Sequence, residues 1–223
     1  MRIHSWNIAQ SLDKPSALIN EWDTDIYCLL ECDSKQELIK LANDKHYRYI
    51  DDSYNMALVS KFTISAFKDI RHSAMSKAIL TCNIDIHGTT ISIYLVHLMM
   101  PLNSKEKHTA QLKEIEFLRE LLQHKKERTI IIGDLNARSR RDGEIENTEA
   151  TDMLESLGYI DSADIFPEQS FCPTKIDRSN NGKRIDYCFV STDLVQFVSG
   201  YGVNNTDADT SDHRAIWIDL DIT

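Results

Sequence analysis

Apolar residues alternate between short continuous runs and helically spaced positions over the first part of the chain. Residues 2–8 and 25–30 form apolar runs of a length typical of strands. Residues 15–22, which open with Pro15, and residues 34–43 carry apolar side chains at helical spacing instead. The chain is therefore predicted to begin as strand, helix, strand, helix.

The middle of the chain is dominated by strand-like runs, at residues 57–60, 64–67, 78–86 and 90–97. The last two flank the dipeptide His87-Gly88, which is typical of a tight hairpin turn, so antiparallel pairing is expected here. Residues 104–126 then carry leucine and isoleucine at helical spacing. They predict the longest helix of the chain.

Strand-like runs return in the second half, after a run at residues 129–132 and a polar loop at 133–147. A helix is expected near 150–157, and late strands near 184–191, 197–202 and 215–220. This order favours an α/β fold of mixed sheets with helices packed outside over a doubly wound parallel sheet. The sequence contains no evident linker or repeat, and we expect residues 1–223 to form a single domain.

The composition adds an acidic balance to this picture. Lys and Arg total 25 against 35 Asp and Glu, which gives a net charge of −10. Hydrophobic residues make up 42% of the chain, enough for a sizeable core. A protein that neutralises many phosphates is expected to be basic, so the acidity argues against broad duplex binding. A polyanionic substrate stays compatible, because a local basic rim can coexist with a negative whole.

The five cysteines are scattered and lack the spacing of metal ligands. We expect free, mostly buried thiols rather than a zinc site. The first residues lack the basic and apolar segments of a secretory signal, and no stretch is long and apolar enough for a membrane span. The expectation is a cytoplasmic protein, without stable membrane association, that is a monomer by default.

Polar residues stand at the ends of otherwise apolar strands, or inside one of them. The set comprises Asn7, Glu31, His97, Asp134, Asn136, Asp186, Asp212 and His213. Loops at strand ends are where rigid scaffolds present catalytic groups. Carboxylate and amide oxygens are also the hard ligands that Mg²⁺ prefers. The pattern predicts a metal-dependent centre.

Each residue of this set also has an ordinary structural interpretation. Glu31 could mark the point where a buried strand surfaces, and Asp134 could belong to a turn. Asp186 lies among apolar residues, where a carboxylate needs a partner, and an ion pair with Arg184 or another neighbour would supply one. His97 and His213 could be hydrogen-bonded histidines of the core. Only the combination favours a functional centre.

Six segments occur together in one order: Ser5-Trp6-Asn7, Leu29-Leu30-Glu31, Val96-His97-Leu98, Ile132-Gly133-Asp134-Leu135-Asn136, Arg184-Ile185-Asp186-Tyr187 and Ser211-Asp212-His213. In this order they resemble the successive motifs of the endonuclease/exonuclease/phosphatase superfamily, whose members are deoxyribonuclease-I-like, and the resemblance spans nearly the whole chain. It implies a four-layer αββα sandwich. Two mixed sheets would pack face to face with helices outside, and the active site would lie at one edge.

The resemblance implies a bound Mg²⁺, for which Mn²⁺ is expected to substitute. Glu31 would be the main metal ligand, with Asn7 and Asp212 beside it. The chemistry of phosphoester hydrolysis asks independently for the same kinds of part. It needs a metal to polarise the phosphoryl group, a base for water, and donors for the charge that develops in the transition state.

The resemblance also assigns catalytic roles around the scissile phosphate. Asp134 would orient or deprotonate the attacking water, and Asn136 would hold phosphate and nucleophile in place. His213, aligned by Asp186, would donate to the phosphoryl oxygen. His97 would contact the same phosphate or assist the leaving group.

The chain departs from the branch of the superfamily that resembles exonuclease III. In that branch the first motif continues Asn-Gly-(Ile/Leu)-Arg-Ala and the second reads Gln-Glu-Thr-Lys. Here residues 8–11 read Ile-Ala-Gln-Ser, and Glu31 lies between Leu30 and Cys32. Where that branch has Tyr, this chain has His97. A His at this position is the commoner form among deoxyribonuclease-, sphingomyelinase- and tyrosyl-DNA-phosphodiesterase-like members. An abasic-site endonuclease is therefore not expected.

Two basic loops are expected beside the acidic centre. The first contains Arg138, Arg140 and Arg141, and the second contains Lys175, Arg178, Lys183 and Arg184. Guanidinium groups suit bidentate phosphate contacts, so Arg138, Arg140 and Arg184 are predicted to bind substrate; a solvated basic loop is the alternative.

These loops favour a nuclease or another nucleic-acid-processing phosphodiesterase. A phosphatase, or a phosphoesterase acting on phospholipid or inositol phosphate, is the alternative within the same superfamily. A binding module without activity is a third reading, which the retained centre disfavours. The sequence leaves open the identity of the substrate and endo- versus exo-action.

Overall fold

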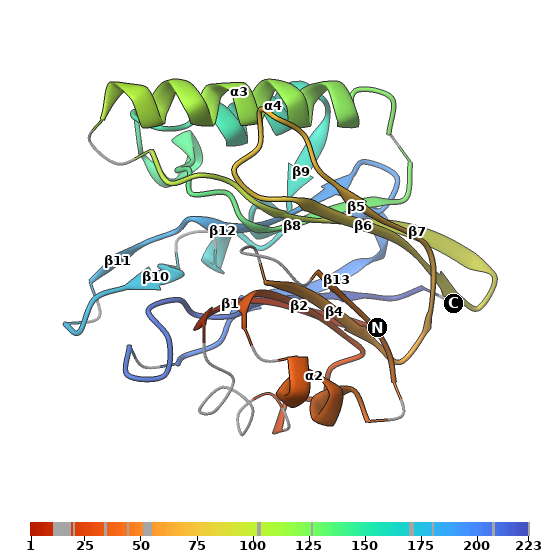
Figure 1. Cartoon of the computed structure of the whole chain (residues 1–223). Helices are drawn as coiled ribbons and strands as arrows, with labels where there is room; N and C mark the ends of the chain where they lie inside the picture. The colour runs from red at the N-terminus through yellow and green to blue at the C-terminus, as the bar shows by residue number, and fades with distance from the viewer. Residues whose placement is uncertain are drawn as a thin grey trace.

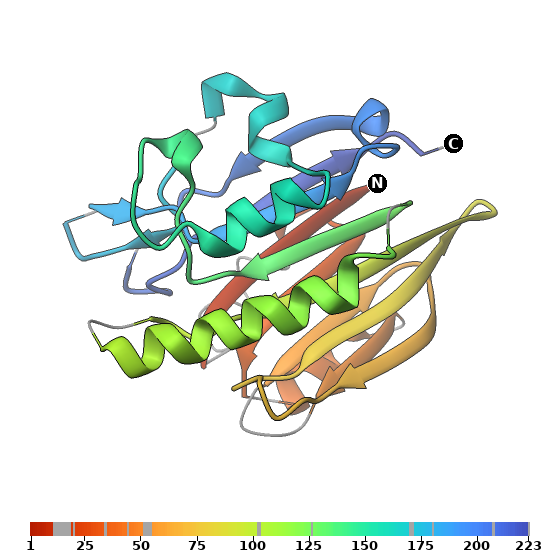
Figure 2. The ribbon, with the colours of Figure 1, turned by 90° about the horizontal axis from the view of Figure 1, so that it is seen from above.

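Two six-stranded mixed sheets pack face to face with helices on their outer sides (Figure 1). This computed structural model describes the chain except for residues 11–18, 20, 34, 44, 51–54, 102–103, 126, 170–171, 180, 207 and 223. Helices α3 and α4 cover the outer face of one sheet, and α2 lies outside the other (Figures 1 and 2). The predicted four-layer αββα sandwich is confirmed.

The first sheet has the order β13-β14-β1-β2-β4-β3. Its strands are β1 (Arg2–Gln10), β2 (Ile26–Cys32), β3 (His46–Ile50), β4 (Met56–Ser60), β13 (Val198–Val203) and β14 (Ile216–Leu220). Strands β1 and β2 are parallel, and the remaining pairs are antiparallel. Because β14 pairs with β1, the last strand of the chain lies beside the first.

The second sheet has the order β5-β6-β7-β8-β12-β9. Its strands are β5 (Thr63–Ile70), β6 (Ile79–Ile86), β7 (Thr89–His97), β8 (Thr129–Asp134), β9 (Tyr159–Asp161) and β12 (Asp186–Ser191). The predicted turn between β6 and β7 is confirmed: His87 and Gly88 have φ values of 48° and 87°, as a tight hairpin turn requires. Strands β7 and β8 run parallel, joined through α3 (Lys105–Leu122).

The other helices are α2 (Lys35–Ala42), α4 (Glu149–Ser156) and α5 (Ser162–Ile165), with 3₁₀ turns at Arg140–Asp142, Pro167–Gln169 and Val195–Phe197. A small hairpin of β10 (Lys175–Ile176) and β11 (Gly182–Lys183) projects from one edge (Figure 2). The helix predicted over residues 15–22 lies mostly outside the described residues. Strands β3, β9, β10 and β11 and the short helix α5 were not predicted.

The inner faces of the two sheets share one hydrophobic core. It includes Ile3, Leu30 and Leu58 from the first sheet and Leu95, Ile132 and Val190 from the second. Among the described cysteines all five are free, and four are buried, as predicted. No described helix meets the length and apolarity needed to cross a membrane. The single domain over residues 1–223 stays a prediction.

Candidate active site

Strand register places three of the predicted residues side by side in the second sheet. His97 at the end of β7 pairs with Asp134 at the end of β8, and Asp134 pairs with Asp186 at the start of β12. All three side chains are buried. These polar side chains form a row at the edge of a sheet made mostly of valine, isoleucine and leucine. They add nothing to its apolar packing, so their placement indicates a functional site.

The first sheet contributes Asn7 and Glu31 from the ends of its two parallel strands. Asn7 Nδ2 donates to Glu31 Oε1 at 3.1 Å and to Asp134 Oδ2 at 3.3 Å, which joins the two sheets across the centre. Glu31 has a φ of 53°, and Asn136 has a φ of 46°. Left-handed backbone costs free energy in residues other than glycine, and its occurrence at two site residues supports a functional constraint.

Gly133 lets β8 approach β7 closely just before Asp134. Its φ is 135°, and a Cβ at this position would lie 2.1 Å from the carbonyl oxygen of Val96. No side chain fits there without moving the backbone of β7. Glycine is thus required for the register that sets Asp134 beside His97.

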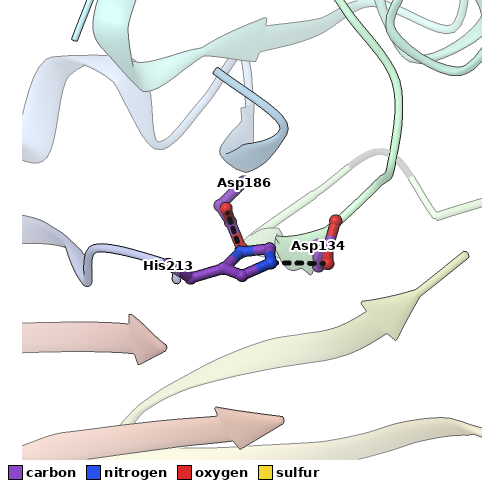
Figure 3. A group of neighbouring side chains, drawn as sticks. All are labelled: Asp134, Asp186 and His213. Atoms are coloured by element: carbon purple, nitrogen blue, oxygen red, sulfur yellow. Dashed lines mark hydrogen bonds and ion pairs between the residues drawn. The ribbon is translucent and has the colours of Figure 1, made fainter. Parts of the chain in front are cut away.

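His213 lies between two buried carboxylates (Figure 3). Its Nδ1 is 2.9 Å from Asp186 Oδ2, and its Nε2 is 3.8 Å from Asp134 Oδ2. Burial lowers the pKa of His213, but the neighbouring Asp186 carboxylate outweighs burial, and the pKa is raised. Burial and the charge of Asp186 raise the pKa of Asp134. A protonated His213 can donate to a phosphoryl oxygen, and a more basic Asp134 is better suited to accept a proton from water near neutral pH.

The loop that carries His213 is tied to β10, because the N–H of Ile176 donates to the carbonyl oxygen of Asp212 at 2.8 Å, and it is tied to β1 as well. Trp6 Nε1 donates to the carbonyl oxygen of His213 at 2.8 Å, and Ser211 Oγ donates to that of Asn7 at 2.8 Å. Thr174 Oγ1 accepts from the backbone N–H groups of both Ile185 and Asp186 at 3.0 Å. These bonds hold Asp186 and His213 in place from outside the reacting row.

His97 faces the centre and contacts a lysine that the sequence did not single out. Its Nε2 is 3.6 Å from both Glu31 Oε1 and Asp134 Oδ2, and it contacts Lys77 Nζ. Burial, followed by the charge of Lys77, lowers the pKa of His97, which favours the neutral ring. The predicted phosphate contact by His97 stays a prediction.

The predicted metal ligands Asn7, Glu31 and Asp212 line one cavity of about 420 Å³. Two carboxylates and an amide are the hard oxygen donors that suit Mg²⁺, so these residues fit such an ion. Asn7 Oδ1 accepts from the N–H of Ala9 at 3.1 Å here. Asp134, Asp186 and His213 also offer ligand atoms within 4.8 Å of one another. Within that second group His213 and Asp186 already share a hydrogen bond.

Asn136 and Arg138 stand beside the centre on the loop after β8. The N–H of Asn136 donates to Asp134 Oδ1 at 2.8 Å, and its side chain donates to the carbonyl oxygen of Leu98 at 2.9 Å. Both residues line a second cavity of about 420 Å³ that also touches Lys175. Arg138 is partly exposed and pairs with Glu144 at 2.7 Å. The structure therefore brings these two predicted residues to one groove.

Arg184 is buried in ion pairs near the centre. Its side chain is 1% exposed, and its guanidinium pairs with Asp142 at 2.8 Å and Asp161 at 2.6 Å. The structure thus places the Arg184 guanidinium between two buried carboxylates and outside the cavities at the centre, and the substrate contact of Arg184 stays a prediction. The alternative for Asp186 is corrected, since its partner is His213 and not Arg184. Arg140 pairs with Asp152 on α4 and lines none of the cavities described here, so its substrate contact stays a prediction.

Sequence reasoning missed two residues that shape the centre, Lys77 and Glu114. Glu114 is fully buried on α3, and its carboxylate accepts from the N–H of Ser76 and that of Met99, each at 2.6 Å. It thereby fixes the loop of Lys77 and the segment after His97. Lys77 precedes the apolar run of β6, but a lysine before a strand is too common to be singled out. Glu114 lies on the buried face of α3 with Ile115 and Leu118, and an acidic residue at that helical spacing was the available signal.

Hydrolysis of phosphoric esters is the activity that this sandwich and this centre define. The chain belongs to the endonuclease/exonuclease/phosphatase family, whose sequence pattern matches residues 4–213. Members of this family are metal-dependent phosphoester hydrolases.

Solved structures similar to this chain share its fold at low sequence identity. The 3′ phosphatase NExo from Neisseria, bound to a product DNA hairpin, is 19% identical with a TM-score of 0.79, and each chain is covered over 100% of its length. An AP endonuclease from Archaeoglobus fulgidus is 16% identical with a TM-score of 0.80, again over 100% of both chains. A humanized TDP2 from D. rerio is 17% identical with a TM-score of 0.74 over 98% of this chain and 97% of that one. No curated protein matches the chain in sequence.

Proposed function

We propose that this protein is a Mg²⁺-dependent hydrolase of phosphate esters in nucleic acid. The observation that carries the proposal is the buried row of Asp186, His213 and Asp134 beside the oxygen ligands of Glu31 and Asp212. A general base, a cationic donor and a cluster of hard ligands at one point are the parts of metal-assisted water attack on phosphorus.

In this proposal each residue has a distinct task. Glu31, Asp212 and Asn7 hold the metal, which polarises the phosphoryl group when bound. Asp134 orients the attacking water and accepts its proton, and Asn136 fixes Asp134 through its backbone N–H. His213 donates to the phosphoryl oxygen on which charge develops. Asp186 holds the imidazole in the required orientation.

Three lines of support favour nucleic acid over a lipid head group. The groove beside Asn136 is bordered by the cations Arg138, Lys175 and Lys183. The similar solved structures include a phosphatase bound to a DNA hairpin and an AP endonuclease. The large exposed apolar side chains of the described residues, such as Ile39 on α2 and Phe197 before β13, are spread over separate elements and suggest no membrane-binding patch.

Cytoplasmic location and a monomeric state belong to the same proposal. Free thiols such as Cys28 and Cys188 fit a reducing compartment. The scissile bond is either an internal phosphodiester, which a nuclease cleaves, or a terminal phosphomonoester, which a phosphatase cleaves. Abasic-site cleavage stays unexpected because the residues around Asn7 and Glu31 differ from that branch.

The test is metal-dependent hydrolysis by the purified protein. Oligonucleotides of DNA and RNA, a 5′-tyrosyl oligonucleotide, inositol phosphates and sphingomyelin are each incubated with Mg²⁺, Mn²⁺ or EDTA. We expect activity on an oligonucleotide that EDTA abolishes and that Mg²⁺ or Mn²⁺ restores. Glu31→Gln is expected to raise the Mg²⁺ concentration for half-maximal rate by about tenfold, as for weakened coordination. Turnover that EDTA leaves intact would contradict metal dependence.

A further inference from the structure

Two lysines reach the catalytic centre in addition to the predicted residues. Lys77 Nζ contacts His97 Nε2, and Lys175 Nζ lies 3.1 Å from His213 Nε2. The two histidines flank Asp134, so each side of the reacting position has its own ammonium group. The lysines come from separate elements, the loop before β6 and strand β10. Their convergence is thus a property of the tertiary fold.

The number of cationic donors matches a phosphomonoester better than a phosphodiester. A monoester carries a charge of about −1.5 to −2 near neutral pH and three non-ester oxygens. An internal diester carries about one charge per phosphate and one fewer free oxygen. Lys77 and Lys175 place two ammonium groups on the two sides of Asp134, and Lys175 Nζ also pairs with Asp212 Oδ2 at 2.7 Å. An extra cation is of most use where the substrate has an extra negative charge.

A groove for the remainder of the substrate leads away from the centre on one side. The cavity that begins at Asn136 and Lys175 is bordered by Arg138 and Lys183. Through Arg138 it continues into a further cavity of about 350 Å³, where Lys105 is the next cation. Arg138, Lys105 and Lys183 are the arginine and lysines that border these two adjoining cavities on the side away from the centre, together with the carboxylates of Asp177 and Glu146.

The opposite side of Lys175 has a different character. There the cavity is lined by Glu31, Asp209 and Asp212, and Lys175 is the sole basic residue among the described residues that line it besides His213. A metal ion would offset part of the negative charge of these carboxylates, but it would add no contact for the nucleic-acid backbone on this side. The surface therefore favours a strand on one side of the reacting phosphorus only.

From these observations we infer that the enzyme removes a terminal phosphate from a nucleic-acid strand, with Lys77 and Lys175 binding the phosphate and the strand lying along the groove of Arg138, Lys183 and Lys105. The inference rests on the proposed phosphoester hydrolase function. In the reaction the water oxygen bonds to phosphorus and the bond from phosphorus to the sugar oxygen breaks. The sugar oxygen takes up a proton, so the products are inorganic phosphate and a strand with a free hydroxyl end.

The first test compares substrates for the unmodified enzyme with Mg²⁺. Oligonucleotides with a 3′-phosphate, a 5′-phosphate or only hydroxyl ends are assayed for released phosphate and for chain cleavage. We expect kcat/KM for phosphate release from one of the two termini to exceed that for internal cleavage by about 100-fold, a factor within reach of one hydrogen bond to a charged group. Internal cleavage at an equal or higher rate overturns the inference and leaves the proposed function in place. Absence of hydrolysis from every substrate overturns the proposed function itself.

The second test separates charge recognition from strand binding. Lys175→Met is assayed on p-nitrophenyl phosphate, a monoester, and on bis(p-nitrophenyl) phosphate, a diester. We expect kcat/KM to fall by about 30-fold or more for the monoester and by about threefold or less for the diester, since a donor that meets the extra charge is lost. Lys113→Met, on the exposed face of α3, is the matched control and should change neither value. Equal losses on both esters overturn the role of Lys175.

The groove has its own variants. Arg138→Ala and Lys183→Ala are expected to raise KM for the phosphorylated oligonucleotide by about five- to tenfold more than they raise KM for p-nitrophenyl phosphate, as loss of uniform binding to the strand predicts. Lys77→Met is expected to behave as Lys175→Met does. Because Lys77 is largely enclosed, the melting temperature of Lys77→Met is measured as well. Lys175, whose side chain is 33% exposed, keeps the test decisive if Lys77→Met unfolds. Unchanged KM in both groove variants overturns the proposed path of the strand.

Discussion

Asp134 is the residue on which both sheets converge. Asn7 from the first sheet, His97 from β7 and His213 from the loop before β14 all lie within 3.8 Å of its Oδ2. Its carboxylate is fully buried and stands beside a second carboxylate, that of Asp186, across the strand pair. Such an arrangement costs stability, and in the proposed mechanism it supplies a basic oxygen at the point where water is activated.

Asp134→Asn is expected to separate activity from stability. Turnover should fall by about 10³-fold or more, because the amide cannot accept a proton from water. The free energy of unfolding should stay unchanged or rise by up to about 2 kcal/mol, since a buried charge is removed. Steady-state kinetics and chemical denaturation measure the two quantities. A variant that is inactive because it has unfolded would contradict this account of Asp134.

His4 shows the cost of a buried imidazole away from the centre. It is 3% exposed, stacks on Trp22 with ring centroids 4.6 Å apart, and bonds to Thr24 Oγ1 at 2.7 Å through Nδ1. Burial, and then the charge of Arg2, lowers its pKa to about 4. The unfolded chain therefore takes up this proton at a higher pH than the folded protein does.

The stability of the protein is accordingly expected to fall as the pH drops from about 6.5 to about 4 through His4. The pKa of His4 is lower in the folded protein than in the unfolded chain, so the neutral ring stabilises the fold fully above the unfolded pKa. This stabilisation, about 3 kcal/mol of the free energy of unfolding, is lost as the pH falls through the window. In denaturation curves at several pH values, the free energy of unfolding should fall less with decreasing pH for His4→Phe than for the unmodified protein. His124→Gln, at an exposed position, is the control and should leave the pH dependence of the free energy of unfolding unchanged.

At the scale of elements, α3 does more than cover the second sheet. Its inner face packs Ile115, Leu118 and Leu122 against the strands, which gives it an ordinary structural role. The same face carries Glu114, whose two oxygens each accept a backbone N–H from a different loop. A helix on the outer layer thus sets the position of two segments that reach the active site.

Glu114→Ala is expected to lower the free energy of unfolding by roughly 3 kcal/mol, because two buried N–H groups lose a charged acceptor. Glu114→Gln keeps one acceptor oxygen and should lose about half as much. Both variants should also lower kcat, as the loops of Lys77 and His97 lose their anchor. Glu120→Ala, on the exposed face of the same helix, is the control for both measurements. Full activity in Glu114→Ala would show that the loops hold their positions without it.

At the scale of the whole molecule, an acidic protein presents a basic path in one place. The net charge is −10, yet Arg138, Lys105, Lys175 and Lys183 line connected cavities beside the centre. Charges of the whole surface repel a polyanion, whereas the groove attracts it locally. Association with nucleic acid is therefore expected to depend on a few contacts rather than on the total charge.

This arrangement predicts a moderate dependence on salt. For about three phosphate contacts to a single strand, KM for an oligonucleotide should rise by about 20-fold between about 50 and about 200 mM monovalent salt. KM for p-nitrophenyl phosphate should rise by less than about threefold, because only the centre contacts it. Arg138→Ala combined with Lys183→Ala should reduce the salt dependence for the oligonucleotide. Steeper dependence, as for a basic DNA-binding protein, would point to contacts outside the groove.

The sequence by itself determined the long elements and the composition of the centre. Apolar runs predicted β1, β2 and β7 because each has enough residues to form a pattern on its own. The polar residues after these strands were recognisable because the family's motifs are local in sequence. Strands β3 and β9 were not predicted, because short edge strands owe their conformation to the neighbours with which they pair.

Only the tertiary structure decided which charged residues face the substrate. Arg184 is two residues from Asp186, yet Asp142 and Asp161, which lie 42 and 23 residues away in the chain, enclose its guanidinium. Lys77 has no motif of its own and reaches His97 through the packing of its loop on α3. Candidate catalytic residues at the end of one strand can be recognised from a short sequence segment. The ion-pair partners of a charged residue, however, come from segments that are distant in the chain. The ionic surroundings of the centre are therefore set by how the segments pack.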